Sequence, residues 1–437
     1  MAKNKLWDKG QDLNERVERF TVGKDRDLDL LLAEYDVKGT MAHIRMLESV
    51  GLLEAVELDK LLAELQRILD EVIIPGNFVI EEGIEDVHSQ IEVMLTRTLG
   101  DIGKKVHSGR SRNDQVLVDL RLFFRDALLS VAKEMKMLFE TLQAQSEKYK
   151  DLLMPGYTHM QAAMPSSFGL WFGAYAESLA DDLVILESTY RVVNKNPLGS
   201  AAGYGSSFPL NRQITTDLLG FEQMVHNVVY AQMGRGKTEQ LVAQAIAVLA
   251  GTLNKMAMDV CTYNSQNFGF LELPEEYTTG SSIMPHKKNP DVFELIRART
   301  NRLRALPNEV AMVTANLSSG YHRDFQLLKE QLFPAIQEII DCLSISAEAI
   351  AQVGVREDIL EDDRYKLIFS VEVVNKLVLD GLPFRDAYKE VGKQIEEGTF
   401  KVPDTLEHTH EGSIGNLMNE QIGQMFMDTY ERLRAQG

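Results

Sequence analysis

The segment Thr279–Asp291 combines residue types that could bind an anion and move a proton. It reads Thr-Gly-Ser-Ser-Ile-Met-Pro-His-Lys-Lys-Asn-Pro-Asp. Its first half is small and polar and lacks helical periodicity, which predicts a mobile loop, and Asn289 as N-cap with Pro290 as first helical residue then predicts a helix start. A serine loop that ends in lysines suits a lid over an anion, whereas a solvated loop before a helix is the structural alternative.

A second segment, Gly156–Gln161, offers a histidine for proton transfer. His159 follows Thr158 in a stretch that we interpret as a loop. Histidine is the side chain whose unperturbed pKa best suits proton transfer near neutral pH. Glu294, one turn into the helix predicted after the serine loop, could orient the ring. Taken alone, a Thr-His pair in a loop is more often structural than catalytic.

Two further segments could bind carboxylates. His107–Gln115 carries Arg110 and Arg112 among small residues just before a helical pattern, which suits a carboxylate-binding loop. Tyr321–Lys329 is a polar stretch that begins another helical pattern. The structural alternatives are solvated arginines at a helix start and an ordinary amphipathic helix. No residue group has metal-ligand spacing and no phosphate-binding glycine motif occurs, so we predict neither a metal nor a cofactor.

Long helices must hold these segments, because helical periodicity dominates the chain. Apolar residues recur every three or four positions over Asn113–Lys150, which predicts a long bundle helix. Further long helical patterns cover about residues 165–194, 239–263, 290–304 and 326–353. Pro334 should kink the last of these. The best strand candidate, Asn77–Ile80, is too short to organise a fold, so the sequence predicts a mainly α protein.

These patterns divide the chain into three predicted domains. Residues 1–103 form a smaller mixed, mostly helical N-terminal domain, residues 104–355 a central five-helix bundle, and residues 356–437 a small helical C-terminal domain. The apolar faces of the central helices are broad for one chain to bury. We therefore expect oligomerisation through helices.

The composition excludes several classes of protein. The net charge of −19 argues against nucleic-acid or acidic-membrane partners, so an anionic substrate would need a local basic island. The two cysteines form no disulfide or zinc pattern, which favours a reducing cytoplasm. Met1–Trp7 lacks the apolar core of a signal peptide, and no uncharged apolar run is long enough to span a bilayer. A cytoplasmic location is therefore expected.

Together the polar segments resemble the fumarase/aspartase superfamily. Its signature, Gly-Ser-Ser-x-Met-Pro-x-Lys-x-Asn-Pro, stands complete over Gly280–Pro290. Within it, Ser111–Val116, Gly156–His159, Pro197–Gly203 and Lys288 resemble the argininosuccinate lyase branch. The resemblance runs from about residue 20 to at least residue 390, so it covers most of the chain. It implies a three-domain, mainly α subunit, four of which form a homotetramer with a twenty-helix core and active sites shared between three subunits.

The resemblance also implies residue roles. His159 and Ser281 would be the acid–base pair, with the assignment of base and acid left open. Glu294 would orient the histidine, and Lys287 would stabilise negative charge. The implied substrate-binding residues are His88, Ser111, Arg112, Asn113, Thr158, Gln161, Asn289, Tyr321, Gln326 and Lys329. The implied reaction is an acid–base elimination that cleaves the C–N bond of argininosuccinate to give arginine and fumarate.

Two segments depart from the superfamily pattern. Phe20–Asp25 lacks the usual serine contact, and Gly234–Glu239 replaces an acidic Ser-x-Arg-Asp segment with a basic one near an expected inter-subunit surface. Two alternatives therefore stay open. One is another fumarate-releasing lyase, acting on adenylosuccinate, aspartate or malate. The other is a catalytically silent, crystallin-like homologue, although every predicted catalytic position holds a competent side chain.

Overall fold

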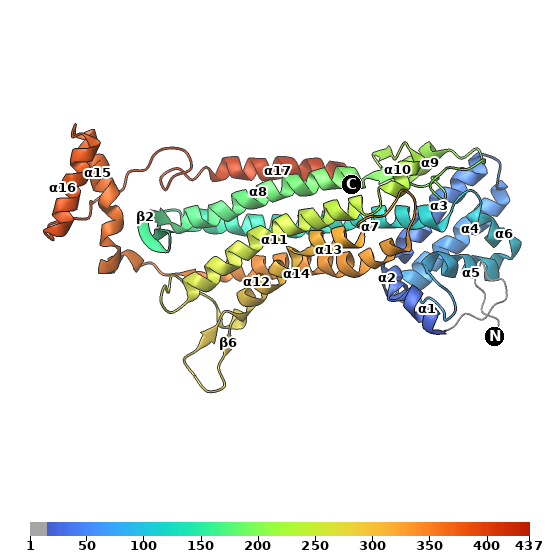
Figure 1. Ribbon diagram of the computed structural model, residues 1–437, viewed down its shortest axis with the longest axis horizontal. Helices are drawn as coiled ribbons and strands as arrows, with labels where there is room; N and C mark the ends of the chain where they lie inside the picture. The colour runs from blue at the N-terminus through green and yellow to red at the C-terminus, as the bar shows by residue number, and fades with distance from the viewer. Residues whose placement is uncertain (1–14) are drawn as a thin grey trace.

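The amphipathic pattern predicted from Asn113 forms α7 (Arg112–Lys148), which runs along most of an elongated molecule (Figure 1). The structure is a computed structural model and describes residues 15–437. The start of α7 is fixed by a capping box, in which Ser111 accepts from the Asn113 N–H and Asp114 accepts from the Ser111 N–H. The helix therefore begins directly at one of the polar segments.

Further long helices pack around α7 into one bundle. They are α8 (Phe168–Val193), α11 (Lys237–Asn264), α12 (Asp291–Leu303), α13 (Leu306–Val313) and α14 (Leu328–Gln352). Helices α8 and α14 pack on α7, and α11 packs on α8 and α12. The five predicted helical stretches are confirmed, with the fourth extended by α13. Helix α14 runs uninterrupted through Pro334.

One apolar core joins these helices. Phe124, Phe168, Phe172, Phe270 and Phe293 are all fully buried in it. Removing one such side chain from water contributes roughly 1.5–3 kcal/mol, so the bundle is a rigid support for the segments at its ends.

Helix α11 is long and apolar enough, by length and composition, to cross a membrane. Half of its most apolar window is buried inside the bundle, where it contacts α8, α12 and α13. These contacts are those of a core helix. Helix α11 also carries charged residues, among them Lys255 and Asp259, so it is not an uncharged apolar run.

The N-terminal part forms a separate helical cluster at one end of α7 (Figure 1). Its helices are α1 (Glu15–Val22), α2 (Asp25–Asp29), α3 (Ala33–Ser49), α4 (Ala55–Ile68), α5 (Val87–Leu99) and α6 (Asp101–Lys104). The predicted strand Asn77–Ile80 is wrong, because these residues pair with no strand in the described chain. The prediction for Met1–Trp7 lies outside the described residues.

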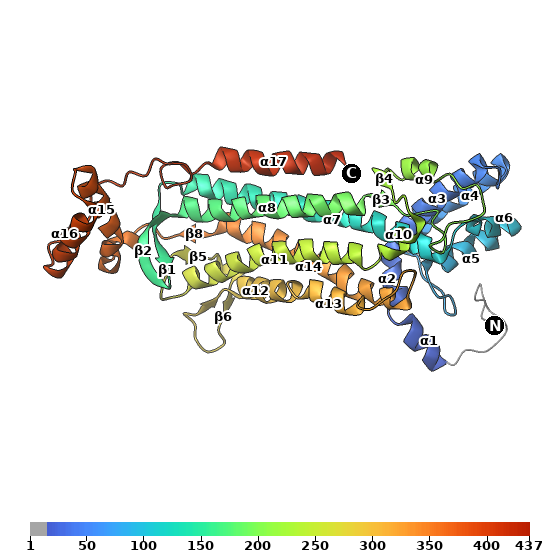
Figure 2. The ribbon, with the colours of Figure 1, turned by 45° about the horizontal axis from the view of Figure 1, so that its top comes forward.

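At the opposite end, α15 (Ser370–Leu379) and α16 (Phe384–Glu396) form a projecting helical pair (Figure 1). Helix α17 (Asn419–Ala435) returns along α8 (Figure 2). Residues 419–435 therefore pack with the bundle rather than with α15 and α16. The predicted domain boundaries after residues 103 and 355 stay a prediction.

The strands are short and form four two-stranded sheets. They are β1 (Leu153–Thr158) with β2 (Gln161–Ser167), β3 (Lys195–Asn196) with β4 (Gln223–Met224), β5 (Leu271–Glu272) with β8 (Gly354–Val355), and β6 (Thr279–Gly280) with β7 (Lys288–Asn289). The remaining short helices are α9 (Arg212–Leu218), α10 (Val228–Met233), the 3-10 turns η1 (Leu30–Leu32), η3 (Lys105–His107), η4 (Glu275–Tyr277), η5 (Arg323–Leu327), η6 (Ile359–Glu361) and η7 (Asp363–Phe369), and the π-turn η2 (Leu69–Ile73).

The start of α12 differs by one residue from the prediction. Pro290 is the N-cap and Asp291 the first helical residue, whereas Asn289 was predicted as N-cap. Asn289 instead pairs with Thr279 in the β6–β7 ladder. Its extended backbone delays the helix, and the ladder closes the base of the serine loop.

Candidate active site

Arg112 is docked on the start of α5. Its Nη1 lies 3.1 Å from Glu85 Oε2 and 3.2 Å from Asp86 Oδ2, and its Nη2 donates to Ser89 Oγ at 2.8 Å. Asp86 also caps α5 by accepting from the Ser89 N–H. The guanidinium therefore has a fixed orientation, and two carboxylates balance its charge.

Asp114 connects the start of α7 to the segment Pro197–Gly203 by hydrogen bonds. Its Oδ1 accepts from the Ser111 N–H at 2.8 Å, while its Oδ2 accepts from the N–H groups of Gly199 at 3.0 Å and Ala201 at 2.8 Å. Burial raises the pKa of Asp114 to about 6, against the effect of these hydrogen bonds. Asp114 is not among the predicted site residues, although the Ser-x-x-Asp capping pattern is visible in the sequence.

Gln326 and Arg323 join η5 to the N-terminal helices. Gln326 Nε2 donates to the carbonyl oxygens of Thr21 at 3.0 Å and Val22 at 2.9 Å. Arg323 donates to the Thr21 carbonyl at 2.9 Å and lies 2.8 Å from Glu85 Oε1. The segment Tyr321–Lys329 is thereby brought to the same end of the bundle as Arg112.

Lys329 is buried between two carboxylates of α2. Its Nζ lies 2.7 Å from Asp25 Oδ1 and also binds Asp29. Burial alone would lower the pKa of Lys329, but Asp29 and Asp25 raise it, so the ammonium stays charged. Burial raises the pKa of Asp25 to about 6, partly opposed by Lys329. The sequence predicts a local cluster of positive charge. In the structure its members Arg112 and Lys329 are paired with carboxylates.

His159 lies at the tip of a β-hairpin, where a loop was predicted. Thr158 and Gln161 pair as the last residues of β1 and β2, so His159 and Met160 form a two-residue turn. Both have positive φ, at 52° and 62°. For residues other than glycine that conformation costs roughly 1–2 kcal/mol each, and such strain is concentrated at functional sites. The turn presents the imidazole at the surface.

The serine loop surrounds the Ser281 oxygen with backbone donors. Ser281 Oγ accepts from the N–H of Ile283 at 3.3 Å and of Met284 at 3.1 Å. Lys287 N–H donates to the Met284 carbonyl at 3.0 Å, which tightens the turn. Two donors aimed at one oxygen stabilise negative charge on it.

Glu294 and Tyr321 contact neither His159 nor Ser281 within the described chain. Glu294 lies 3.7 Å from the Arg297 guanidinium and is half exposed. The Tyr321 ring packs edge-on against Phe325, with 6.3 Å between the ring centroids.

The structure thus sorts the predicted residues into three separate groups. The N-terminal group holds His88, Ser111, Arg112, Asn113, Tyr321, Gln326 and Lys329, the hairpin group holds Thr158, His159 and Gln161, and the serine-loop group holds Ser281, Lys287, Asn289 and Glu294. The hairpin and the N-terminal group lie at opposite ends of the bundle, and the serine loop projects from its side (Figure 2). A groove of about 680 Å³ between α7 and α14 contains none of them.

Comparisons with known proteins identify the family. A family model described as "Lyase" matches residues 16–304. A Bacteroides fragilis protein named argininosuccinate lyase is 60% identical over 99% of this chain and 97% of its own. Another so named, from Parabacteroides distasonis, is 62% identical over 96% and 94%. The chain belongs to the argininosuccinate lyase family.

Solved structures extend the likeness beyond the argininosuccinate lyase family. EDDS lyase in complex with formate superposes with a TM-score of 0.74 at 22% identity, covering 98% of this chain and 91% of the other. A class II fumarase from Schistosoma mansoni gives 0.72 at 15% identity, with 95% and 93% covered. At these identities the fold alone is shared. The predicted family and the fumarase/aspartase-like fold are confirmed.

The segment Gly234–Glu239, which departs from the superfamily pattern, is buried within the subunit except for Lys237. Arg235 Nε is 3.0 Å from Glu239 Oε1, both side chains are buried, and Arg235 Nη2 donates to the Phe325 carbonyl at 3.1 Å. Gly236 makes the turn possible with a φ of 78°. The segment braces η5, and with it Gln326.

Proposed function

We propose that this chain is an argininosuccinate lyase, which cleaves the C–N bond of argininosuccinate to give arginine and fumarate in arginine biosynthesis. The observation that carries the proposal is 60% identity, over nearly the full length, to a protein of that name. A complete set of predicted acid–base side chains argues against a silent homologue. The complete segment Ser111–Gln115 and the residues Tyr321, Gln326 and Lys329 argue against another superfamily lyase.

In the proposed elimination, Ser281 acts as base and His159 as acid. Removing a proton beside a carboxylate pushes negative charge onto that carboxylate, and Lys287 would stabilise it. A neutral serine is a poor base, so its alkoxide needs support. The two N–H groups that donate to Ser281 Oγ supply part of that support. His159 would then protonate the departing guanidino nitrogen.

The proposed substrate site uses the N-terminal group. Arg112 and Lys329 would hold carboxylates, Asn113, Tyr321 and Gln326 would donate hydrogen bonds, and Thr158 and Asn289 would complete the site from the other groups. Since Arg112 and Lys329 are already ion-paired, substrate carboxylates would compete with protein carboxylates for them.

We further propose a homotetramer in the cytoplasm, with each site built by three subunits. Two observations support shared sites. The three residue groups lie apart in one chain, and long helices expose apolar side chains such as Val184, Ile185, Val248 and Met258. Light scattering should give four times the 49.2 kDa of one chain. A stable, active monomer would remove the proposal of shared sites.

Fumarate release, followed by ultraviolet absorbance, tests the function. Purified protein is given argininosuccinate, adenylosuccinate, aspartate or malate in turn. Release from argininosuccinate alone supports the proposal. Release from a different substrate would keep the mechanism and overturn the substrate. No release from any of them would favour the silent homologue.

A further inference from the structure

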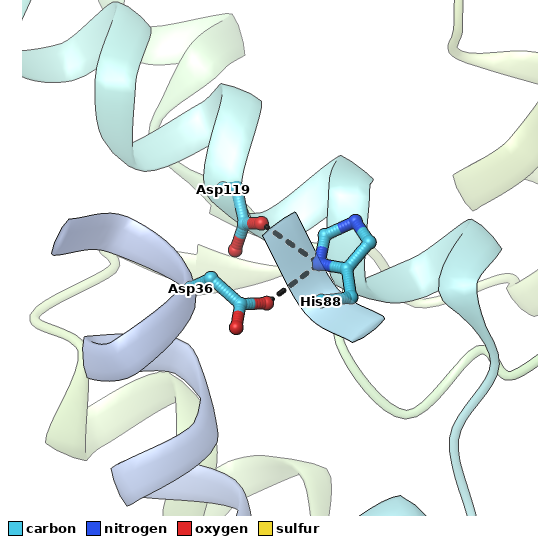
Figure 3. Close-up of side chains that lie close together, drawn as sticks. All are labelled: Asp36, His88 and Asp119. Carbon is cyan, nitrogen blue, oxygen red and sulfur yellow. Dashed lines mark hydrogen bonds and ion pairs between the residues drawn. The ribbon is translucent and has the colours of Figure 1, made fainter. Parts of the chain in front are cut away.

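His88 lies where three helices of different segments meet. Its Nδ1 is 2.6 Å from Asp36 Oδ1 on α3 and 3.5 Å from Asp119 Oδ2 on α7 (Figure 3). All three side chains are at least nine-tenths buried. Two carboxylates from separate helices therefore face one ring nitrogen.

The carboxylates have few other partners. Asp36 Oδ2 and both oxygens of Asp119 make no hydrogen bond within the described chain. Burying an unpaired carboxylate oxygen is unfavourable, so such groups need a compensating charge. The His88 ring faces both groups. Burial and the neighbouring Asp36 raise the pKa of Asp119 well above its ordinary value, and the positive charges of His88 and Arg110 oppose that rise.

The groups around His88 favour its charged form. Burial alone would lower its pKa, but Asp36, and then Asp119 and the N-cap Asp86, raise it to about 9. His88 is the second residue of α5, where the helix dipole disfavours a cation. The carboxylates outweigh that effect.

One further cation, Arg110, and a second histidine, His107, lie near the cluster. Arg110 is buried, donates to Thr40 Oγ1 at 2.9 Å and interacts with Asp36 and Asp119. His107 lies close enough to His88 for their charges to interact. Burial, followed by Arg110 and other cations, lowers the pKa of His107 to about 4, so that ring is neutral near pH 7.

The second nitrogen of His88 is turned away from both carboxylates (Figure 3). It has no hydrogen-bond partner among residues 15–437. We propose that Asp36 and Asp119 are positioning residues that hold His88 as an imidazolium, with its Nε2–H presented to a carboxylate of the substrate. This inference rests on the proposed function, in which the N-terminal group that includes His88 holds the substrate.

The same three groups place one ligand atom each within 4.8 Å of one another, which a divalent cation could also use. The 2.6 Å between Nδ1 and Oδ1 is a hydrogen-bond distance, however, and favours a shared proton. Metal analysis of the purified protein distinguishes a bound divalent cation from a shared proton. One equivalent of a divalent metal that is lost in Asp36→Asn would overturn the proton assignment.

Nitrogen-15 NMR of histidine-labelled protein tests the charge state directly, with His88→Asn used to assign the signal. The wild-type ring should give imidazolium shifts from pH 6 to 8.5. In Asp119→Asn the pKa of His88 should be at least one unit lower than in the wild type. A neutral wild-type ring at pH 7 would overturn the proposal. This readout needs no turnover, so it stands even if argininosuccinate is not the substrate.

Steady-state kinetics test the positioning role. For Asp119→Asn, KM for argininosuccinate should rise about tenfold at pH 8.5 and recover toward the wild-type value at pH 6, with little change in kcat. Asp36→Glu should retain more of the wild-type KM than Asp36→Asn. Asp182 on α8 is a buried aspartate outside the predicted site. Asp182→Asn is the matched control and should change neither KM nor kcat at either pH. An equal rise in the KM of Asp119→Asn at pH 6 and pH 8.5 would indicate a merely structural role and overturn the proposal.

Discussion

Ser281, the proposed base, shows how far the backbone alone can stabilise the alkoxide form of a serine. Its oxygen already accepts two N–H groups from its own loop, Ile283 and Met284, while the loop stands open to solvent. These donors favour the alkoxide over the alcohol. The remaining requirement is a positive charge and exclusion of water, which closure of the loop would supply.

Ser281→Ala should lower kcat for fumarate release by about 10²–10⁴-fold, the range for loss of a positioned acid–base group, with a smaller change in KM. The assay is fumarate absorbance under saturating argininosuccinate. Its neighbour Ser282→Ala is the matched control and should retain most activity. Near-normal turnover by Ser281→Ala would remove the proposed base.

The His88 charge also predicts a pH effect on stability. The folded-state pKa of about 9 lies above the ordinary value of 6.5, so the stabilisation is fully present below pH 6.5 and is lost as pH rises through 9. The Tm difference between wild type and His88→Asn should therefore shrink by at least about 2 °C between pH 6 and pH 10. Differential scanning fluorimetry measures it. A constant difference would contradict the prediction.

At the scale of elements, the turn before α11 links a helix start to η5. Gly236 has a φ of 78°, and a Cβ there would lie 2.8 Å from Thr314 Cγ2. Arg235 and Glu239 on either side of it form the buried pair that reaches Phe325. The turn needs glycine for both conformational and steric reasons.

Gly236→Ala should destabilise the protein by roughly 1–3 kcal/mol, the cost of a strained backbone position. Chemical denaturation measures the change. Gly392→Ala, on α16 with open space around its Cβ, is the control and should be neutral or stabilising by about 0.5–1 kcal/mol. Equal effects of the two substitutions would contradict the steric argument.

Some of the helices and strands could be predicted from the sequence, and others could not. The long helices were identified because their apolar periodicity is local. The β1–β2 hairpin was missed because Pro155, Gly156 and Pro165 hide its strand pattern. The partners of the predicted site residues, such as Asp25 for Lys329 and Asp36 for His88, lie far away in sequence. Pairing of that kind depends on the fold, and no local pattern reports it.

At the scale of the whole molecule, the separation of the three residue groups decides how a site can form. One chain holds the hairpin and the N-terminal group at opposite ends of a rigid bundle (Figure 1). Bending the bundle to join them would expose its core. Association of several chains is the simpler way to bring the groups together.

Mixed oligomers should therefore recover activity. When inactive His159→Gln and Ser281→Ala proteins are unfolded together and refolded, about one quarter of the sites should receive two intact groups if different chains supply them. Fumarate release measures the recovery. Ser281→Ala mixed with Lys287→Met, two changes in one loop, is the control and should stay inactive. No recovery in the first mixture would contradict shared sites.

The connection between α7 and α14 has a consequence for how the protein is made. Gln145 donates to the Ile350 carbonyl across 205 residues of chain, and α17 covers α8 only at the end of the sequence. A ribosome adds roughly 5–20 residues per second, so the face of α7 that packs on α14 waits roughly 10–40 s for that helix. During that time its apolar stripe is open to chaperones or to other nascent chains. Yield in a host cell should therefore depend on translation speed and chaperone supply, even where the finished bundle is stable.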